Sequence, residues 1–155
     1  MQVTKNQEGD VTVLHFAGTI DHDDASFDQL VGPLSGKVRV NTRDVLRINS
    51  IGVKGWIMYF TQLRNKSIQL SFNEVSCGLM QQAALLKGFL LPKEVVSFQV
   101  LYICEACEKD CSVLIQVQDL MRPDFEPPEG VCPACNGKLI LDDFLDDYKA
   151  IFKVK

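Results

Sequence analysis

Short apolar stretches along the first hundred positions predict a series of β-strands. Residues 11–18 (VTVLHFAG) form a nearly continuous apolar run that ends at glycine, which is typical of a central strand buried on both faces. In residues 37–40 (KVRV), apolar and charged positions alternate with the period of two expected of a strand with one buried face. Residues 67–72 (SIQLSF) repeat this alternation, and residues 95–103 (VVSFQVLYI) form another strand-like run.

Apolar residues at helical spacing predict helices between these strands. In three segments, apolar side chains recur every three or four positions and so share one face of a helix. These faces are Phe27, Leu30, Val31 and Leu34; Val53, Trp56, Ile57, Phe60 and Leu63; and Val75, Leu79, Ala83 and Leu86. Asp23 or Asp24 suits the start of the first helix, and Gly88 suits the end of the third, expected over residues 74–87. Strands interleaved with helices predict an α/β fold with helices packed on a mixed sheet.

Charge and cysteine content change together near residue 100. Residues 1–99 carry 10 Lys and Arg against 9 Asp and Glu, whereas residues 100–155 carry 6 against 11. Five of the six cysteines lie in this acidic second part, four of them as two C-x-x-C pairs. We therefore predict two domains, residues 1–100 and residues 101–155, the second being small, β-rich and closed by a short helix within residues 142–152 (DDFLDDYKAIF).

The composition is typical of a globular protein in a reducing compartment. Nearly half of the residues are apolar, yet no charge-free apolar run approaches the roughly 18 residues that span a membrane. The first ten residues also lack the apolar segment of a signal peptide. We therefore expect a cytoplasmic protein with no membrane partner, whose cysteines are thiols or metal ligands.

Two C-x-x-C pairs carry the strongest chemical signal in the chain. Cys104 and Cys107 form the first pair, and Cys132 and Cys135 form the second after 24 intervening residues. Each pair lets a tight turn aim two thiolates at one ion, and four sulfurs at about 2.3 Å in a tetrahedron predict a structural zinc site. The stretch resembles a zinc ribbon. A rubredoxin-like iron site, a redox dithiol and disulfides remain alternatives.

The other cysteines and the two histidines suit structural roles. Cys111 begins the alternating run CSVLIQVQ and is expected to be a small strand side chain, and Cys77 is expected to be a buried helix thiol. His15 lies in an apolar strand, where a hydrogen-bonded interior histidine is expected. The acidic residues around His22 are expected to serve the helix start rather than a metal.

Three motifs in the first hundred residues occur in the order and spacing of a known family. FAGTIDHDDA is similar to a G-x-[LI]-D stretch, VRVNTRDVLRINSIG to a strand, connecting turn and D-S-x-G motif, and LLKGFL to the glycine that ends a later helix. With these motifs, residues 10–100 resemble the STAS family, named for sulfate transporters and anti-sigma-factor antagonists. The resemblance implies a STAS-like fold that binds proteins around one helix start. The residues at the motif positions are Gly18, Ile20, Asp21, His22, Asn49, Ser50 and Gly52. The resemblance implies that the partner binds at Asp21, His22, Asn49, Ser50, Gly52 and the adjacent Lys54.

The resemblance implies a phosphoacceptor at Ser50. The family's antagonists are phosphorylated on the serine after the motif's aspartate, and this chain has Asn49 in place of that aspartate. The exchange removes a charge that a kinase could recognise. From the residues themselves, Ser50 is either a helix N-cap or a phosphate acceptor, since both roles use the exposed amides of a helix start. Gly52 would allow close approach of a partner's backbone or serve internal packing.

These observations together predict a nonenzymatic regulatory or scaffolding protein that acts through protein–protein binding. The resemblance implies a kinase of the anti-sigma-factor type as its partner. No Ser/His/Asp set, phosphate-binding glycine loop or open metal site argues for catalysis. A transcription-complex or nucleic-acid adaptor is the first alternative, but the acidic ribbon would repel phosphates. A rubredoxin-like electron-transfer module is the second.

Overall fold

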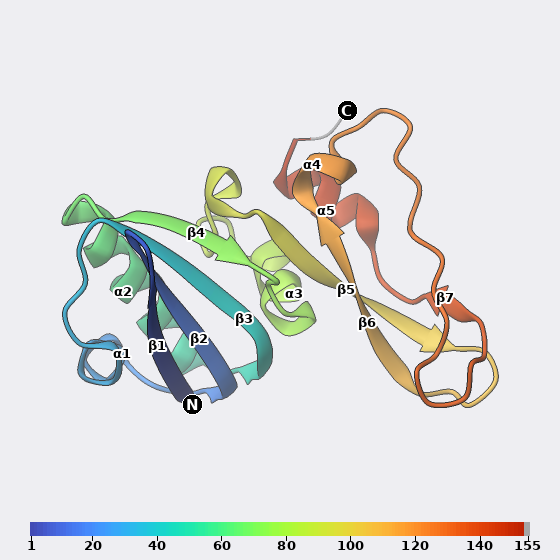
Figure 1. Cartoon of the computed structure of the whole chain (residues 1–155), viewed down its shortest axis with the longest axis horizontal. Coiled ribbons are helices and arrows are strands. Elements are labelled where there is room, and N and C mark those ends of the chain that lie inside the picture. The colour runs from blue at the N-terminus through green and yellow to red at the C-terminus, as the bar shows by residue number, and fades with distance from the viewer. Residues whose placement is uncertain (154–155) are drawn as a thin grey trace.

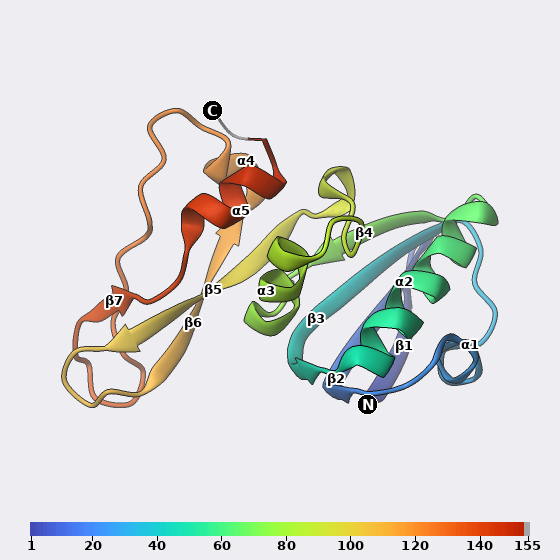
Figure 2. The ribbon, with the colours of Figure 1, turned by 180° about the vertical axis from the view of Figure 1, so that it is seen from behind.

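The computed structural model describes residues 1–153, which form two lobes joined by one long strand (Figure 1). The elements of the first lobe are β1 (Gln2–Glu8), β2 (Val11–Ile20), α1 (Asp24–Val31), β3 (Lys37–Ile48), α2 (Ser50–Asn65) and β4 (Gln69–Asn73). The four strands form one sheet in the order β1-β2-β3-β4, in which β1 is antiparallel to β2 and the other pairs are parallel. Helices α1 and α2 cover one face of this sheet (Figure 2). The expected α/β fold with helices on a mixed sheet is confirmed.

The second lobe is built on a smaller antiparallel sheet with the order β6-β5-β7. Its strands are β5 (Ser97–Cys104), β6 (Asp110–Gln116) and β7 (Leu139–Leu141). The remaining elements are α3 (Cys77–Leu85), the 3₁₀ helix η1 (Pro92–Glu94), α4 (Val117–Leu120) and α5 (Leu145–Ile151). The final helix expected in residues 142–152 is therefore present, and α3 lies between the two sheets beside α5 (Figure 1).

Strand β2 is buried on one face only. Leu14 and Phe16 point towards the helices and are fully buried, whereas Val13 and His15 on the opposite face are half-exposed. The expectation of burial on both faces is wrong, because no helix within residues 1–153 covers the second face. The predicted interior position of His15 is wrong for the same reason: its Nε2 lies 2.8 Å from Asp44 Oδ2 on this open face.

Two features of the first sheet differ from the sequence pattern. β1 was not predicted, because nearly all of its side chains are exposed at the sheet edge and no apolar alternation marks it. β3 continues to Ile48, through residues 41–48, where a connecting turn was expected. β4 pairs only with residues 37–41 of β3. The later half of β3 is therefore held mainly by β2, and its exposed residues conceal the strand in the sequence.

Aromatic side chains hold α2 against the sheet. Trp56 is fully buried, with its ring centroid 6.1 Å from Phe16 and 5.7 Å from Phe72, and its Nε1–H donates to the Phe89 carbonyl at 3.1 Å. Phe60 packs 4.5 Å from the same ring. Burying each such side chain contributes roughly 2–3 kcal/mol. This packing fixes the start of α2 relative to the ends of the strands.

The third helix is shorter than the predicted span of residues 74–87. Ser76 is its N-cap, and the Leu79 amide donates to the Ser76 hydroxyl at 3.4 Å. Val75 lies before the helix in a bridge to β5, and Leu86 lies after its end. Leu79 and Ala83 are buried as predicted.

Strand β5 connects the two lobes. At its start, the Val96 amide donates to the Phe72 carbonyl at 2.8 Å, and the Gln99 amide donates to the Val75 carbonyl at 2.7 Å. β6 pairs with β5 from Ser97 to Ile103, and β7 pairs with its far end from Tyr102 to Cys104. Residue 100, where the sequence changes character, lies in the middle of this strand, and the buried side chains of both lobes form one continuous core. No helix within residues 1–153 has the length and apolar character needed to cross a membrane.

Candidate functional site

The four cysteines of the two C-x-x-C pairs lie together at the tip of the second lobe. Cys104 ends β5 and Cys107 follows in the turn to β6, while Cys132 and Cys135 lie in the turn before β7. The four Sγ atoms lie within 4.8 Å of one another. The Sγ separations of 3.4 Å (Cys104 to Cys135) and 3.8 Å (Cys107 to Cys132) approach the edge of about 3.8 Å of a tetrahedron with 2.3 Å metal–sulfur bonds. The cluster is thus close enough to hold a metal ion.

The two cysteine turns have the same backbone geometry. The amide of Glu108 donates to the Cys104 carbonyl, and that of Asn136 donates to the Cys132 carbonyl, both at 2.9 Å. Glu108 and Asn136 both have φ +62°. A Cβ on the next residue of the second turn, Gly137, would lie 2.8 Å from Cys104 Sγ, so glycine is needed for the turns to approach. The structure thus builds a pair of matched knuckles.

Backbone amides in each knuckle stabilise a thiolate. The amides of Cys107 and Ala106 donate to Cys104 and lower the pKa of its thiol. In the second knuckle, the Ala134 and Cys135 amides lower the pKa of Cys132 to about 6. Thiolates are the form that binds metal, and these N–H groups favour that form at Cys104 and Cys132, whereas the pKa of Cys135 is raised to about 12 beside the neighbouring sulfurs.

The other two cysteines lie outside this group. Cys111 is half-buried in β6, in the strand where it was predicted. Cys77 is the first residue of α3, only half-buried, with its Sγ 3.7 Å from the Ser112 hydroxyl. Within residues 1–153, the four clustered cysteines form the one group of three or more potential ligands that come together.

Asn49, and not Ser50, caps helix α2. The Asn49 side-chain oxygen accepts a hydrogen bond from the Gly52 amide at 2.9 Å, and Asn49 has extended backbone angles. Ser50 is the first residue of the helix and is exposed. The interpretation of Ser50 as the cap is therefore wrong, because the residue in the aspartate position of the resembled motif takes the capping role.

Gly52 has an internal packing role. It is buried, and a Cβ there would overlap the carbonyl oxygen of Ile20 at the end of β2. One turn later, a Cβ on Gly55 would overlap the carbonyl oxygen of His22. The two glycines let α2 lie directly on the backbone that links β2 to α1.

The other residues expected to bind a partner surround this helix start. Asp21 Oδ1 lies 2.7 Å from His22 Nδ1, and the next residue, Asp23, caps α1 as predicted. Hydrogen bonds from the Ser26 hydroxyl and amide lower the pKa of the Asp23 carboxyl. Lys54 is exposed and, with Ser50, borders a hollow of about 460 Å³. Its walls are Asp23, Asp24, Ser50, Ile51, Lys54, Gly55 and Met58.

The cap assignment predicts which substitution weakens the helix. Replacing Asn49 with alanine is expected to lower the free energy of unfolding by about 1 kcal/mol, because the Gly52 amide loses its acceptor. Ser50→Ala is expected to change it by less than about 0.5 kcal/mol. Urea unfolding followed by circular dichroism measures both, and equal losses for the two variants would contradict the assignment.

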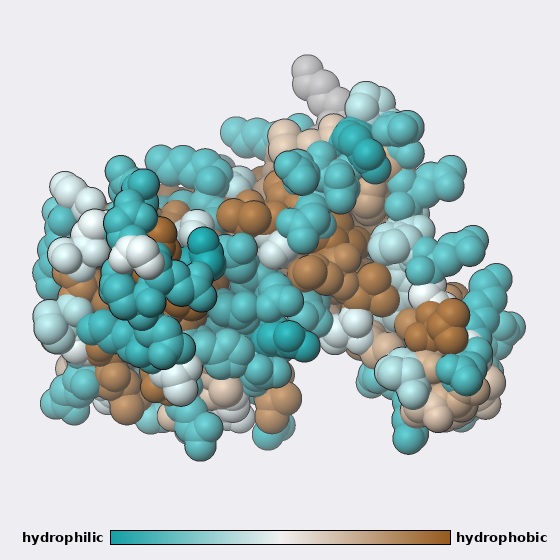
Figure 3. Space-filling model, in the orientation of Figure 1, coloured by the Kyte–Doolittle hydropathy of each residue, from teal (hydrophilic) through white to brown (hydrophobic). Residues whose placement is uncertain are grey.

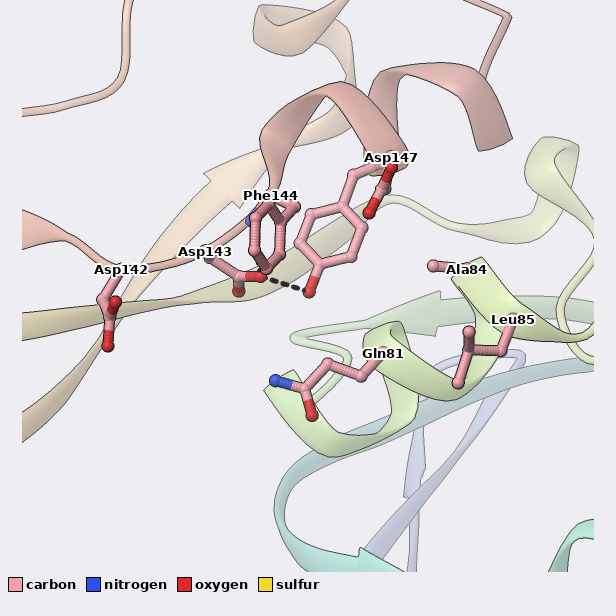
Figure 4. Close-up of a pocket in the computed structure, with 8 residues that line it drawn as sticks. Gln81, Ala84, Leu85, Asp142, Asp143, Phe144 and Asp147 are labelled. Carbon is pink, nitrogen blue, oxygen red and sulfur yellow. Dashed lines mark hydrogen bonds between the residues drawn. The ribbon is translucent and has the colours of Figure 1, made fainter.

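Another hollow lies between α3 and the start of α5 (Figure 4). The sequence did not predict it. Its volume is about 310 Å³. Its residues come from distant parts of the chain: Gln81, Ala84, Leu85, Asp142, Asp143, Phe144, Asp147 and Tyr148. No local motif links these positions, so only the packing of α5 beside α3 brings them together.

A search of protein-family models, curated proteins and solved structures finds no match to this chain.

Proposed function

We propose that this chain is a nonenzymatic regulatory or scaffolding protein that binds a partner protein at the start of α2. The observation that carries the proposal is the division of roles at this helix start: Asn49 caps the helix, which leaves the exposed Ser50 hydroxyl available. Ile51, 58% exposed, adds an apolar contact beside it. An apolar side chain next to an unused hydroxyl and the cationic Lys54 suits recognition by another protein.

A phosphate on Ser50 would regulate this binding. It would add about −1.5 to −2 charges at the positive end of α2, where exposed amides favour an anion. Lys54 borders the same hollow, and Arg47 is exposed just before the helix. The likeness to the STAS motif supports a kinase of the anti-sigma-factor type as the partner, although Asn49 replaces the charge of the motif's aspartate.

We further propose that the cysteine cluster holds one structural zinc ion. Four thiolates fill a tetrahedral site and leave no position for substrate, so the ion would stabilise the lobe rather than catalyse a reaction. The residues present suit zinc, because their sulfurs are soft donors at tetrahedral spacing. A colourless protein with one zinc per chain supports this assignment, whereas red protein containing iron contradicts it.

The binding proposal predicts a difference between two aspartate substitutions. In affinity capture from the native cell, Ser50→Asp is expected to recover about tenfold less of a partner that the wild type captures, because the new charge alters the binding surface. Ser35→Asp is the matched control, since Ser35 is also exposed but lies in the loop before β3. It should retain the partner.

Two outcomes would contradict the proposal. Quantitative mass spectrometry of the captured proteins could return the same set for the wild type and Ser50→Asp, which would exclude Ser50 from the binding surface. For the phosphate switch, native extract with labelled ATP should modify the wild type but not Ser50→Ala. Equal labelling of both would contradict phosphorylation at Ser50 and would leave the zinc proposal unaffected.

A further inference from the structure

The three most exposed large apolar side chains of the described residues border two neighbouring hollows on α3. Leu85 is 83% exposed, Phe144 77% and Leu46 73%. Leu85 and Phe144 line the hollow between α3 and α5, and Leu85 and Leu46 line a second hollow of about 300 Å³ between α3 and the end of β3. Leu85 and Gln81 are common to both hollows, so the surface is continuous. Apolar side chains that are gathered in this way mark a binding surface.

The side of this surface next to α5 is acidic. Asp142, Asp143 and Asp147 line the hollow between α3 and α5, and no lysine or arginine lines it. Figure 4 shows these residues on one wall of the hollow, facing Gln81 and Leu85 of α3 on the other. Asp142 and Asp147 are exposed, and neither forms an ion pair with any residue in the described part of the chain. Their charges are therefore available to a ligand.

Asp143 has a different role, because it holds the acidic wall in shape. Its carboxylate accepts hydrogen bonds from the Leu101 amide at 3.1 Å, the Phe144 amide at 2.9 Å and the Tyr148 hydroxyl at 2.9 Å. These bonds tie the start of α5 to β5. The position of Phe144 is thus set by a satisfied network, so that the hollow is formed before any ligand binds.

We propose that the Leu46–Leu85–Phe144 surface docks a basic amphipathic segment of a partner protein. The segment would set large apolar side chains on Leu85 and Phe144 and place a lysine or arginine against Asp142 and Asp147. The negative charge of the wall favours lysine or arginine in the docked segment. The exposed side chains of Leu85 and Phe144 favour apolar residues in the same segment. A hollow of about 310 Å³ is at the lower end of the range for small-molecule sites, which suits one or two side chains.

The hollow between α3 and the end of β3 extends this surface towards the start of α2. Leu46, Arg47 and Ile48 of its wall directly precede the Asn49 cap. A segment docked along α3 would therefore end close to Ser50. This inference rests on the proposed function in treating the chain as a protein-binding module, but it adds the chemistry of the partner.

Fluorescence anisotropy with the full chain tests the proposal. The probe is a fluorescein-labelled peptide of leucine and lysine, with its leucines at helical spacing. We expect it to bind the wild type, and we expect a matched peptide of leucine and glutamate to bind at least about tenfold more weakly. Equal binding of the two peptides, or no binding of the lysine peptide, would overturn the proposal.

Variants locate the binding on the surface. Leu85→Ser and the double variant Asp142→Asn/Asp147→Asn are each expected to weaken binding of the lysine peptide about tenfold. The controls are Val131→Ser, an exposed apolar residue near the cysteine cluster, and Asp146→Asn, an exposed acid of α5 outside the hollow. Controls that weaken binding equally would show attraction to the acidic lobe in general and overturn the site. None of these variants alters Ser50, so failure here is distinguishable from failure of the proposed function.

Discussion

Replacement of Cys132 with serine is expected to abolish metal binding and destabilise the second lobe by about 3 kcal/mol or more. The Cys132 thiol is fully buried within the cluster, and a serine hydroxyl is a poor substitute for a thiolate ligand. Strand β7 has only three residues, which pair with β5 at Tyr102, Ile103 and Cys104. Without a bound ion, this short pairing would depend on the buried Leu139 side chain and on the Asp143 hydrogen bond to Leu101 just beyond the strand.

Metal analysis and hydrogen exchange measure this result. The wild type should contain one ion per chain, and Cys132→Ser should contain none. Amides of β7 should lose protection in the variant, whereas those of β2 should keep it because they lie in the other sheet. A chelator applied to the wild type should reproduce the loss, and added zinc should reverse it.

Cys111→Ser is the matched control for this prediction. Cys111 lies in β6 near the cluster but is not one of the four grouped sulfurs. We expect this variant to retain the metal and the melting temperature of the wild type. Loss of metal from Cys111→Ser, or full metal content in Cys132→Ser, would show that the ligand set is different.

Gly52→Ala is expected to lower the free energy of unfolding by about 3 kcal/mol, because overpacking against backbone is relieved only by moving α2. The added Cβ would overlap the Ile20 carbonyl oxygen. The same oxygen accepts a hydrogen bond from the Asn49 amide at 3.1 Å, so movement of the helix also strains the cap.

Gly78→Ala in α3 is the control for helix propensity. Its Cβ would meet only the Leu46 carbonyl oxygen, at 3.3 Å. The gain of about 1 kcal/mol from replacing a helical glycine should offset this mild crowding. Urea unfolding compares the two variants, and equal stability would contradict the packing role of Gly52.

Apolar surface is also present elsewhere in the second lobe. Figure 3 shows apolar side chains where β5 and β6 cross and beside β7. Val131 and Ile140, near the cysteine cluster, are 64% and 43% exposed. Unlike Leu85 and Phe144, they do not line any of the hollows described above. This difference makes Val131 a suitable control for apolar contact alone.

The sequence by itself determined the elements whose signal is local. Helix α2 was predicted because its buried residues recur at helical spacing, and the four cysteines were predicted as one site because each C-x-x-C pair forms its own turn. The cap of α1 at Asp23 was recognisable for the same reason. In each case, the deciding interactions join residues a few positions apart.

Only the tertiary structure decided the features that depend on distant neighbours. β1 became a strand through pairing with β2, and β2 has one open face because both helices lie on the other. Asn49 rather than Ser50 is the N-cap of α2, where the end of β3 meets the helix and the Asn49 amide donates a hydrogen bond to the Ile20 carbonyl. The hollow beside Leu85 exists because α5 packs against α3, about sixty residues earlier in the chain. Such contacts leave no periodic pattern in the sequence, since each side of the contact satisfies only its own local spacing.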